Sequence, residues 1–381
     1  MKWALKTLDE LGYVGRGKSR HRPRNAEHLY GGIYPLIQTG DIQKANFYIN
    51  DYSQTYSEDG LAQSKLWKAG TMVISIVGAN TAETAILGID ACFPDSVIGF
   101  IPDNNEADVK FVKYNLECIK GHLKSISEGT ARENLSLEKL LSLRLPIPPL
   151  PTQRRIASIL SAYDELIENN LRRVKLLEKR AFNSYRILRK LEKYKLSDLY
   201  DTSSGGTPSR TNSDYFTGEI NWFKSKELDD SILLESEEKI TENAVEKSSA
   251  KIFPVGSVII AMYGATIGKL GILSQESTTN QACCAIIEKE EVQSNYYIFN
   301  WLLENREYIL SFRMGAAQEN ISQQVIKNLW VSIPSSKELQ SFNTEIKPVY
   351  QLIKNLQKQN AKLREARDIL LPRLMNGEIV V

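Results

Sequence analysis

The sequence predicts a mixed α/β fold (α+β) in which two similar globular domains are each followed by a long helix. The octapeptides GTARENLS (129–136) and GAAQENIS (315–322) begin 186 positions apart, and the same offset aligns KAGTMVIS (68–75) with PVGSVIIA (254–261). Several matches at one offset indicate a duplicated domain. Short β-branched runs broken by Gly, Pro and Asn are typical of strands, and the glycine-free, Leu- and Lys-rich stretch behind each domain is typical of a helix.

Composition sets the broad class of protein. A chain of 381 residues is long enough for two or three units, and 42% hydrophobic and 25% charged residues are typical of a soluble globular protein. No apolar run is long enough to span a bilayer, and the N-terminus lacks the apolar core of a signal peptide, so a cytoplasmic location is expected. Cys92, Cys118, Cys283 and Cys284 form no C-x-x-C pair, and we expect buried free thiols.

The domain boundaries follow from changes in amino-acid composition along the chain. The predicted segments are 1–151 for the first domain, 152–195 for the first long helix, 196–335 for the second domain and 336–381 for the second long helix with a tail. Two shorter helices, near 107–124 and 293–312, are expected to pack on the sheets of the two domains.

Both long helices carry an apolar seam that advances alternately by three and four residues, the spacing of a coiled coil. Its predicted members are Ile156, Leu160, Ile167, Asn170 and Leu177 in the first helix and Phe342, Ile346, Ile353, Asn360 and Leu363 in the second. Asn170 and Asn360 are polar breaks in the two seams and are predicted to lie close together. Pro348 must either kink the second helix or restart it, because proline lacks a backbone donor.

Four strings give the chain a resemblance to a known family. They are LPIPPLPTQRRIASILSAYDELIENN (145–170), SGGTPSRTNSDYFTGEINWFKSKEL (204–228), GAAQENISQQVIKNLWVSIP (315–334) and LLPRLMNGEIVV (370–381). In this order, and with the duplication, the chain resembles the specificity subunits of type I restriction-modification systems.

The resemblance implies both an architecture and a set of partners. It implies two target recognition domains, each reading one half of a split DNA sequence, separated by long helices that form an antiparallel coiled coil in a pseudo-twofold circular arrangement. Such a subunit binds double-stranded DNA, two methyltransferase subunits and the restriction motor and nuclease subunits, but no membrane. S-adenosylmethionine is then expected in the methyltransferase subunit and not in this chain.

The motifs of a catalyst are missing from the sequence. It contains no Gly-rich cofactor loop, no catalytic motif of an acidic residue or Asn followed by Pro-Pro, and no G-x-x-x-x-G-K-[ST] loop of an ATPase. The three histidines, His21, His28 and His122, all lie in the first domain, so a duplicated site cannot depend on histidine. We expect a non-catalytic chain that holds neither a metal nor a cofactor.

Candidate DNA-binding residues of the first domain begin in a basic segment, RGKSRHRPR (16–24). The candidates are Arg16, Lys18, Ser19, Arg20, Arg22 and Arg24, followed by Gln38, Thr39 and Asn80. Five cations without an acid suit phosphates, and arginine also reads guanine edges; the alternative is a solvated basic loop. Gln38 and Thr39 can read base edges, although their segment 37–42 also fits an ordinary turn at the end of a strand.

Candidates of the second domain begin in a glycine segment, GGTPSRTN (205–212), which is either a phosphate-cradling nest or a turn. They are Thr207, Ser209, Arg210 and Asn212, then Lys224 and Lys226 as phosphate contacts, and Tyr263 and Thr266 in a loop that aligns near Gly78 and Asn80. For the two loops around Asn80 and Tyr263 two alternatives stay open: they face DNA, or they are ordinary turns at the edge of a sheet. Asn134 and Asn320, in the opening octapeptides, are expected to cap the following helices or to brace their loops.

A different class of function stays open at this point. A scaffold or regulator would bind a protein through its helices and never touch DNA, so it would show no salt-sensitive binding to duplex DNA. A self-contained modification enzyme is excluded by the missing cofactor motifs.

Overall fold

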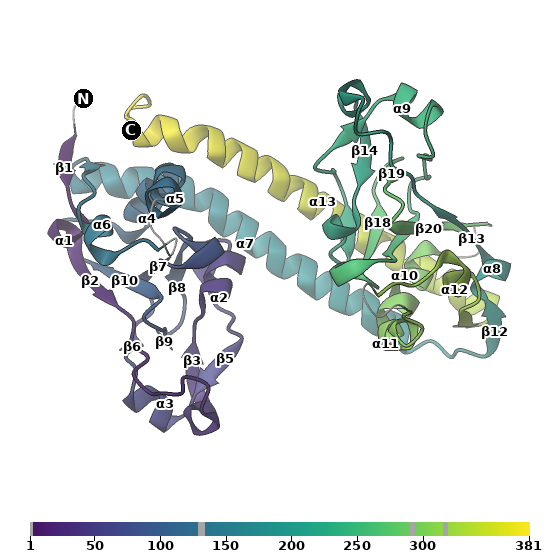
Figure 1. Ribbon diagram of the computed structural model, residues 1–381, viewed down its shortest axis with the longest axis horizontal. Coiled ribbons are helices and arrows are strands. Elements are labelled where there is room, and N and C mark those ends of the chain that lie inside the picture. Colours follow the sequence, from purple (N-terminus) through teal and green to yellow (C-terminus); the bar gives the residue numbers. More distant parts are fainter. Residues whose placement is uncertain (1–2, 129–133, 290–293, 315–318) are drawn as a thin grey trace. The chain divides into compact units, whose positions relative to one another are not determined.

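The computed structural model describes residues 3–128, 134–289, 294–314 and 319–381, which divide into two compact units (Figure 1). Unit 1 contains Met1–Asn169 together with Asn360–Val381, and unit 2 contains Asn170–Gln359. Unit 1 is therefore assembled from two stretches of chain that are far apart in the sequence. None of the described helices has a stretch long and apolar enough to span a membrane.

Unit 1 has a central sheet of order β2-β10-β7-β8-β4 and a distal sheet of order β5-β3-β9-β6. All four residues of β7 and of β8 are buried, because both faces of the central sheet are covered. Figure 1 shows α4, α5 and α6 at one end of the unit and the distal sheet with α3 at the other. The elements are β1 (Ala4–Lys6), α1 (Leu8–Leu11), β2 (Gly12–Arg16), η1 (Glu27–Leu29), β3 (Tyr30–Leu36), α2 (Thr39–Lys44), β4 (Tyr48–Ile49), β5 (Gln54–Tyr56), α3 (Glu58–Ala62), β6 (Leu66–Trp67), β7 (Met72–Ser75), η2 (Gly78–Asn80), β8 (Thr84–Leu87), β9 (Ala91–Cys92), β10 (Val97–Pro102), α4 (Val109–Cys118), α5 (Lys120–Glu128), α6 (Leu137–Leu141) and β11 (Leu145–Ile147).

Unit 2 repeats this plan, with a central sheet of order β13-β20-β17-β18-β15 and a distal sheet of order β16-β14-β19. Its elements are β12 (Glu192–Lys195), α8 (Leu196–Leu199), β13 (Tyr200–Ser204), η3 (Ser213–Phe216), β14 (Ile220–Phe223), η4 (Ser225–Glu227), β15 (Ser231–Leu233), β16 (Lys239–Ile240), α9 (Glu242–Glu246), β17 (Val258–Ala261), η5 (Gly264–Thr266), β18 (Leu270–Leu273), β19 (Thr278–Thr279), β20 (Cys283–Glu288), α10 (Asn295–Glu304), α11 (Arg306–Leu310), α12 (Gln323–Lys327) and β21 (Trp330–Ile333). The long helices are α7 (Leu150–Arg186) and α13 (Ser336–Met375).

Strand pairing shows the duplication residue by residue. Val73 pairs with Ala85 in unit 1, and Ile259 pairs with Gly271 in unit 2. The distal sheets match as well, with Leu36 opposite Cys92 and Trp222 opposite Thr278. Each residue of unit 2 in these pairs lies 186 positions after its counterpart, so the predicted duplicated fold is confirmed.

The two shorter predicted helices are also confirmed, but each is broken in two. Residue 119 separates α4 from α5, and residue 305 separates α10 from α11. These break points are related by the same offset as the paired strands. Among the cysteines, Cys92, Cys283 and Cys284 are buried free thiols as expected, whereas the expectation was wrong for Cys118, which is exposed.

The long helices pair antiparallel. Asn170 Nδ2 donates to Gln359 Oε1 at 3.1 Å, and Ser184 Oγ donates to Glu345 Oε1 at 3.1 Å, so the partner number falls along α13 as the number rises along α7. Most seam residues are at most 3% exposed, namely Ile156, Leu160, Ile167, Asn170, Phe342, Ile346, Ile353 and Asn360, while Leu177 and Leu363 are partly buried. The proximity of Asn170 to Asn360 stays a prediction.

One expectation about the long helices was wrong. The first helix does not reach residue 195 but ends at Arg186, because Glu192–Lys195 form β12 and pair with Trp330–Ile333 of β21. Of the two alternatives for Pro348, a restart of the second helix is excluded, since α13 continues through it. Ile346 and Val349 are buried on either side of this proline, and their packing holds the segment helical.

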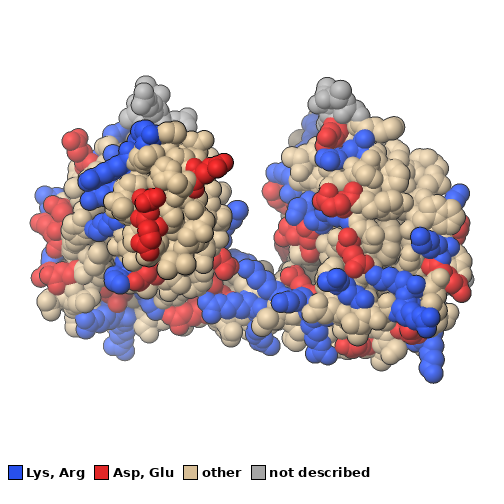
Figure 2. All heavy atoms as spheres, turned by 90° about the horizontal axis from the view of Figure 1, so that it is seen from below, with Lys and Arg blue, Asp and Glu red and all other residues tan. Residues whose placement is uncertain are grey.

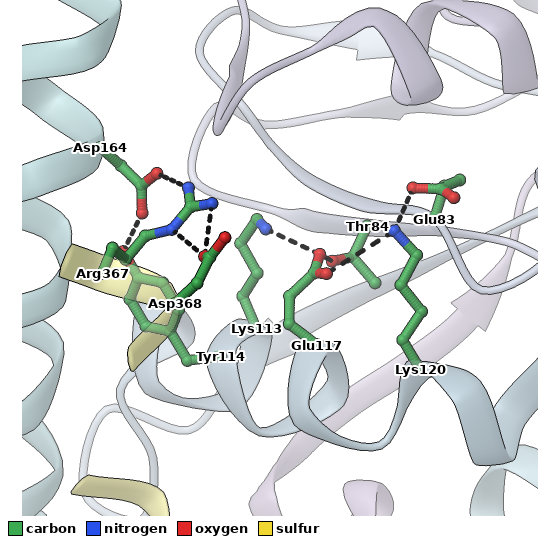
Figure 3. A network of polar contacts seen from close by, with 9 residues as sticks. All are labelled: Glu83, Thr84, Lys113, Tyr114, Glu117, Lys120, Asp164, Arg367 and Asp368. Carbon is green, nitrogen blue, oxygen red and sulfur yellow. Dashed lines mark hydrogen bonds and ion pairs between the residues drawn. The ribbon is translucent and has the colours of Figure 1, made fainter. Parts of the chain in front are cut away.

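In unit 1 a buried ion pair ties both long helices to α4 (Figure 3). Arg367 of α13 pairs with Asp164 of α7, and the Tyr114 hydroxyl of α4 donates to the same carboxylate at 2.5 Å. Asp164 is only 1% exposed, so these two partners replace the water that its charge would otherwise bind. In unit 2 the equivalent place holds a neutral contact, from Asn300 Nδ2 to the Tyr350 hydroxyl at 2.9 Å.

Beside this ion pair lies a polar cavity of about 390 Å³ in unit 1. Glu117 on its wall accepts hydrogen bonds from Lys113 at 3.0 Å and Thr84 at 2.7 Å, and Lys120 lies 3.7 Å away (Figure 3). Burial by itself raises the pKa of Glu117, but the two lysines and the threonine outweigh it and hold the pKa below its ordinary value. The carboxylate therefore stays ionised, and opposite charges line this cavity.

Candidate nucleic-acid interface

The basic segment and the glycine segment leave equivalent strands of the two units. Gly17 N donates to Val97 O at 2.9 Å where the chain leaves β2, and Gly205 N donates to Cys283 O at 3.1 Å where it leaves β13. A Cβ at Gly17 would lie 2.3 Å from Phe93 O, and one at Gly205 would lie 2.3 Å from the Thr279 carbonyl oxygen. Both turns therefore need glycine, and the two segments start from matching places.

The backbone of the basic segment is fixed by residues that lie far away in sequence. Gln63 Oε1 accepts from the backbone N of Arg20 at 2.6 Å and from that of His21 at 3.1 Å. Ser64 Oγ donates to Lys18 O at 2.9 Å. The segment is thus a defined loop with its side chains displayed.

The cations of the basic segment are exposed and largely uncompensated. Arg24 pairs with Asp95 at 2.8 Å, and Arg22 Nη1 donates to the carbonyl oxygens of Ser19 and His21. For Arg16, Lys18, Arg20 and Arg22 the described part of the chain provides no ion pair with Asp or Glu. Four positive charges therefore remain available to phosphates.

The glycine segment fits a turn better than a phosphate nest. The amide groups of Gly205 and Gly206 already donate to strand carbonyl oxygens. Its side chains are engaged too: Thr207 donates to Gln281, Ser209 and Thr211 share a hydrogen bond of 2.8 Å, and Asn212 Oδ1 caps η3 by accepting from Asp214 N. Arg210 remains as its charged side chain.

A second pair of candidates also occupies equivalent positions. Gln38 precedes α2, and its backbone N donates to Asp41 Oδ2 at 2.8 Å. Lys224 precedes η4, and its backbone N donates to Glu227 Oε1 at 2.9 Å. Segment 37–42 is therefore a helix start, with Thr39 as the first residue of α2, and the Gln38 side chain donates to Gln54 at 3.3 Å.

The third pair of candidates lies in the short helical turns η2 and η5. Asn80 belongs to η2, Thr266 to η5, and Tyr263, 38% exposed, precedes η5. Each turn is braced by an isolated bridge, Val77 with Asn134 and Tyr263 with Asn320. Of the two alternatives for these asparagines, bracing is therefore correct.

Capping by Asn134 and Asn320 was wrong, because serines two residues later perform it. Ser136 Oγ accepts from Lys139 N and Ser322 Oγ from Val325 N, both at 3.2 Å. Asn134 and Asn320 take part in the isolated bridges, two residues before these cap positions. The first residues of the two octapeptides, 129–133 and 315–318, lie outside the described residues.

Within each unit the first and third groups of candidates meet at one end of the central sheet. In unit 2 three consecutive residues make the link: Gln281 contacts Thr207, Ala282 O accepts from Met262 N, and Cys283 O accepts from Gly205 N. In unit 1 the equivalents of Ala282 and Cys283 act in the same way, since Ser96 O accepts from Ile76 N and Val97 O from Gly17 N. The structure thus gathers candidates that are far apart in sequence.

Unit 2 adds two residues that sequence reasoning missed, Glu237 and Glu238, here called the carboxylate pair. Arg210 Nη1 lies 2.5 Å from Glu238, and Lys224 Nζ lies 2.9 Å from each carboxylate. Lys226 Nζ lies 2.7 Å from Glu237. The acidic run ESEEK (235–239) was visible in the sequence, but nothing local links it to these cations.

The carboxylate pair is ionised. Hydrogen bonds from Lys226 and Lys224 lower the pKa of Glu237, and those from Arg210 and Lys224 lower the pKa of Glu238. Burial alone would lower the pKa of Lys224, but the two carboxylates raise it above its ordinary value. The five residues therefore carry three positive and two negative charges at neutral pH.

On the face that Figure 2 shows, neither unit presents a surface of one sign. Figure 2 shows Lys and Arg side chains interleaved with Asp and Glu over the visible surfaces of both units, in keeping with a net charge of +2. Within the described ranges, no group of three or more His, Cys, Asp or Glu side chains could hold a metal ion. Any attraction for a polyanion must come from local groups such as the basic segment.

Comparison with known proteins links this geometry to a family. The chain is 23% identical to the MjaIX specificity subunit of Methanocaldococcus jannaschii over all of its length and 94% of that protein, and 25% identical to the EcoR124I/EcoR124II specificity subunit of Escherichia coli over 62% of each. In fold it is similar to the crystal structure of a type I restriction-modification S subunit from M. genitalium, with a TM-score of 0.63 at 16% identity over 98% of this chain and 96% of that one. Residues 1–179 and 189–365 match the family described as type I restriction modification DNA specificity domain. Since these residues are most of its length, the chain belongs to that family.

Proposed function

We propose that this chain is the DNA-specificity subunit of a type I restriction-modification enzyme. It recognises a DNA target of two unlike half-sites and positions methyltransferase subunits, and with them the restriction motor and nuclease subunits, on that target. The observation that carries the proposal is the placement of cation-bearing loops at the same end of two duplicated sheets.

A duplicated reader with diverged loops suits a target with two unlike halves. The recognition domains would comprise residues 1–151 and 196–335, and the long helices would separate them. Arg and Lys of the loops would neutralise phosphates, which gives affinity, while Arg, Asn and Gln side chains would contact base edges, which gives specificity. The match of both sequence halves to one DNA specificity family supports the presence of two recognition domains.

The reaction itself would belong to the partners. Two methyltransferase subunits per chain, one for each half of the target, would dock on the long helices and would hold S-adenosylmethionine. The chain would be non-catalytic, in keeping with the missing cofactor and ATPase motifs.

The first expected result concerns activity. The purified chain is expected neither to methylate nor to cut DNA, and methylation should appear when a methyltransferase of this type is added. Sequencing of methylated adenines with and without the gene would return both half-sites and their spacing. Methyl transfer by the chain alone would contradict the proposal, and so would an unchanged methylation pattern after deletion of the gene.

The second expected result separates the two readers. Arg20→Ala should weaken recognition of one half-site and Arg210→Ala recognition of the other, because these side chains lie in different units. Loss of a base contact should relax one position at about 1–3 kcal/mol, and loss of a phosphate contact should instead lower the salt dependence. Binding to targets with single base changes would measure both, and equal losses at both half-sites would count against separate readers.

A protein-binding scaffold gives a different outcome in the same experiments. It would show no salt-sensitive affinity for duplex DNA, even with its partners present. Salt titration of DNA binding by the wild-type chain therefore decides between the two functions.

A further inference from the structure

The carboxylate pair of unit 2 is held in place by buried groups of β14. Asn221, 1% exposed, accepts from Ser236 N through its Oδ1 at 3.3 Å. Trp222 N donates to Ser236 Oγ at 2.9 Å, and Ser236 Oγ donates to Glu238 O at 2.5 Å. The loop that carries the two glutamates is therefore fixed to the distal sheet before any ligand arrives.

The two carboxylates contact the same cationic groups of Arg210, Lys224 and Lys226 that a DNA phosphate would contact. Glu238 lies between Arg210 and Lys224, and Glu237 lies between Lys224 and Lys226. Only 16% of the Lys224 side chain is exposed, so its charge is turned inward to the pair. A phosphate that approaches these cations must compete with carboxylates that are already in contact.

The Arg210 guanidinium is also oriented, because it lies over two aromatic rings. Its central carbon is 4.3 Å from the ring centroid of Phe216 and 4.9 Å from that of Trp222. About half of the side chain, 53%, remains exposed. A guanidinium fixed in one plane is suited to bidentate contact with a guanine edge and less suited to following a phosphate backbone.

The equivalent loop of unit 1 has the opposite character. In its basic segment the only acidic partner among the described residues is Asp95, which pairs with Arg24. The other four cations of the basic segment have no carboxylate partner in the described part of the chain and together carry a charge of about +4. The three cations and the carboxylate pair of unit 2 together carry a net charge of about +1. These two groups of residues thus differ in the positive charge that they can offer to DNA of any sequence.

We propose that Glu237 and Glu238 are specificity-determining residues of the second recognition unit. They cancel the charge of Arg210, Lys224 and Lys226, so that this unit gains little affinity from phosphates and discriminates through base contacts. Sequence-independent attraction then comes mainly from the basic segment of unit 1. This inference rests on the proposed DNA-binding function and adds to it a division between an anchoring unit and a selecting unit.

The test uses the full chain with its methyltransferase partner and the variant E237Q/E238Q. Affinity is measured against salt concentration for the target DNA and for the same DNA with the half-site of unit 2 scrambled. Glutamine keeps the shape of glutamate but frees the cations, so the slope of log K against log salt should steepen by about 1 to 2, at about 0.9 per added phosphate contact. The preference for target over scrambled DNA should fall about tenfold.

The matched control is E242Q/E246Q on α9. It also removes two negative charges from unit 2, at exposed positions of α9 that form no ion pair with Arg210, Lys224 or Lys226 in the described part of the chain. If the wild type discriminates the half-site but E237Q/E238Q behaves like this control, the inference is overturned while the proposed function stands. If the wild type binds neither DNA, the proposed function itself fails.

A second measurement does not require the double variant to fold. Because Lys224 is already neutralised, Lys224→Gln should change the salt slope less than Lys18→Gln, which removes an uncompensated charge. Equal changes for the two single variants would overturn the inference. Loss of all target binding by a folded E237Q/E238Q protein would also overturn it, because the carboxylates would then be direct contacts to bases.

Discussion

Replacement of Arg367 by Met is expected to destabilise unit 1 by about 3–5 kcal/mol. Methionine keeps most of the side-chain stem but removes the cation that faces Asp164. That carboxylate is 1% exposed, and among the described residues it would keep the hydroxyl of Tyr114 as a hydrogen-bond donor and only the more distant guanidinium of Arg364 as a positive charge. A buried charge without its counter-ion is among the most destabilising changes in a protein interior.

The duplicated fold provides an internal reference for this measurement. Hydrogen exchange of the amides in β7 and β8 should accelerate in the variant, while that of β17 and β18 in unit 2 should change little. Arg373→Met is the matched control on the same helix, because this residue is half exposed and lies 3.6 Å from Glu378, where an ion pair is worth at most about 1 kcal/mol.

A second substitution should rescue the first. Asp164→Asn in the Arg367→Met background removes the unpaired charge and leaves an amide that can still bond to Tyr114, so the double variant should be more stable than Arg367→Met alone. If the double variant is as unstable as the sum of both single changes, packing and not charge pairing explains the loss.

Neutralisation of the basic segment should produce the largest change in DNA binding. With Arg16, Lys18, Arg20 and Arg22 all replaced by Gln, the slope of log K against log salt should fall by about 3 to 4 if each cation neutralises one phosphate. Between 50 and 200 mM salt the wild type would then lose about a hundredfold more affinity than the variant. The preference for the half-site that unit 2 reads should change far less than the affinity.

A control with the same change in net charge distinguishes contacts from overall electrostatics. Four other cations of unit 1 are each paired with an acid: Lys6 with Glu106, Lys68 with Asp90, Lys110 with Glu165 and Arg144 with Glu10. Their replacement by Gln should leave the salt slope closer to that of the wild type. An equal loss of slope in the two quadruple variants would show that total charge, and not the basic segment, governs binding.

The duplication and the types of secondary structure could be predicted because each depends on residues that are close together in the sequence. Gly17 and Gly205 stand where a Cβ would meet a carbonyl oxygen, and the strings around Val73 and Ile259 are apolar because both faces of their strands are covered. The end of α7 at Arg186 could not be predicted in the same way. It depends on the pairing of β12 with β21, and β21 follows the rest of the second domain in the sequence.

The candidate interface also has features that the sequence shows and features that only the fold shows. Arg20 and Arg210 are candidates from the sequence alone, because charge and position in a repeat are visible there. Their surroundings are not, since Gln63 reaches the backbone of the basic segment from 43 positions away and Glu238 reaches Arg210 from 28. A side chain's identity is local information, whereas its partner is a property of the folded domain.

The discontinuous make-up of unit 1 has a consequence for synthesis on the ribosome. Unit 2 is one continuous stretch, Asn170–Gln359, and can close its core once that stretch has emerged. The core of unit 1 includes Leu374 and Met375, which pack with residues such as Phe111 and Ile156. The domain that is translated first is therefore completed last, and its partly built core, with the apolar face of α7 uncovered, must wait until the whole of unit 2 has been translated.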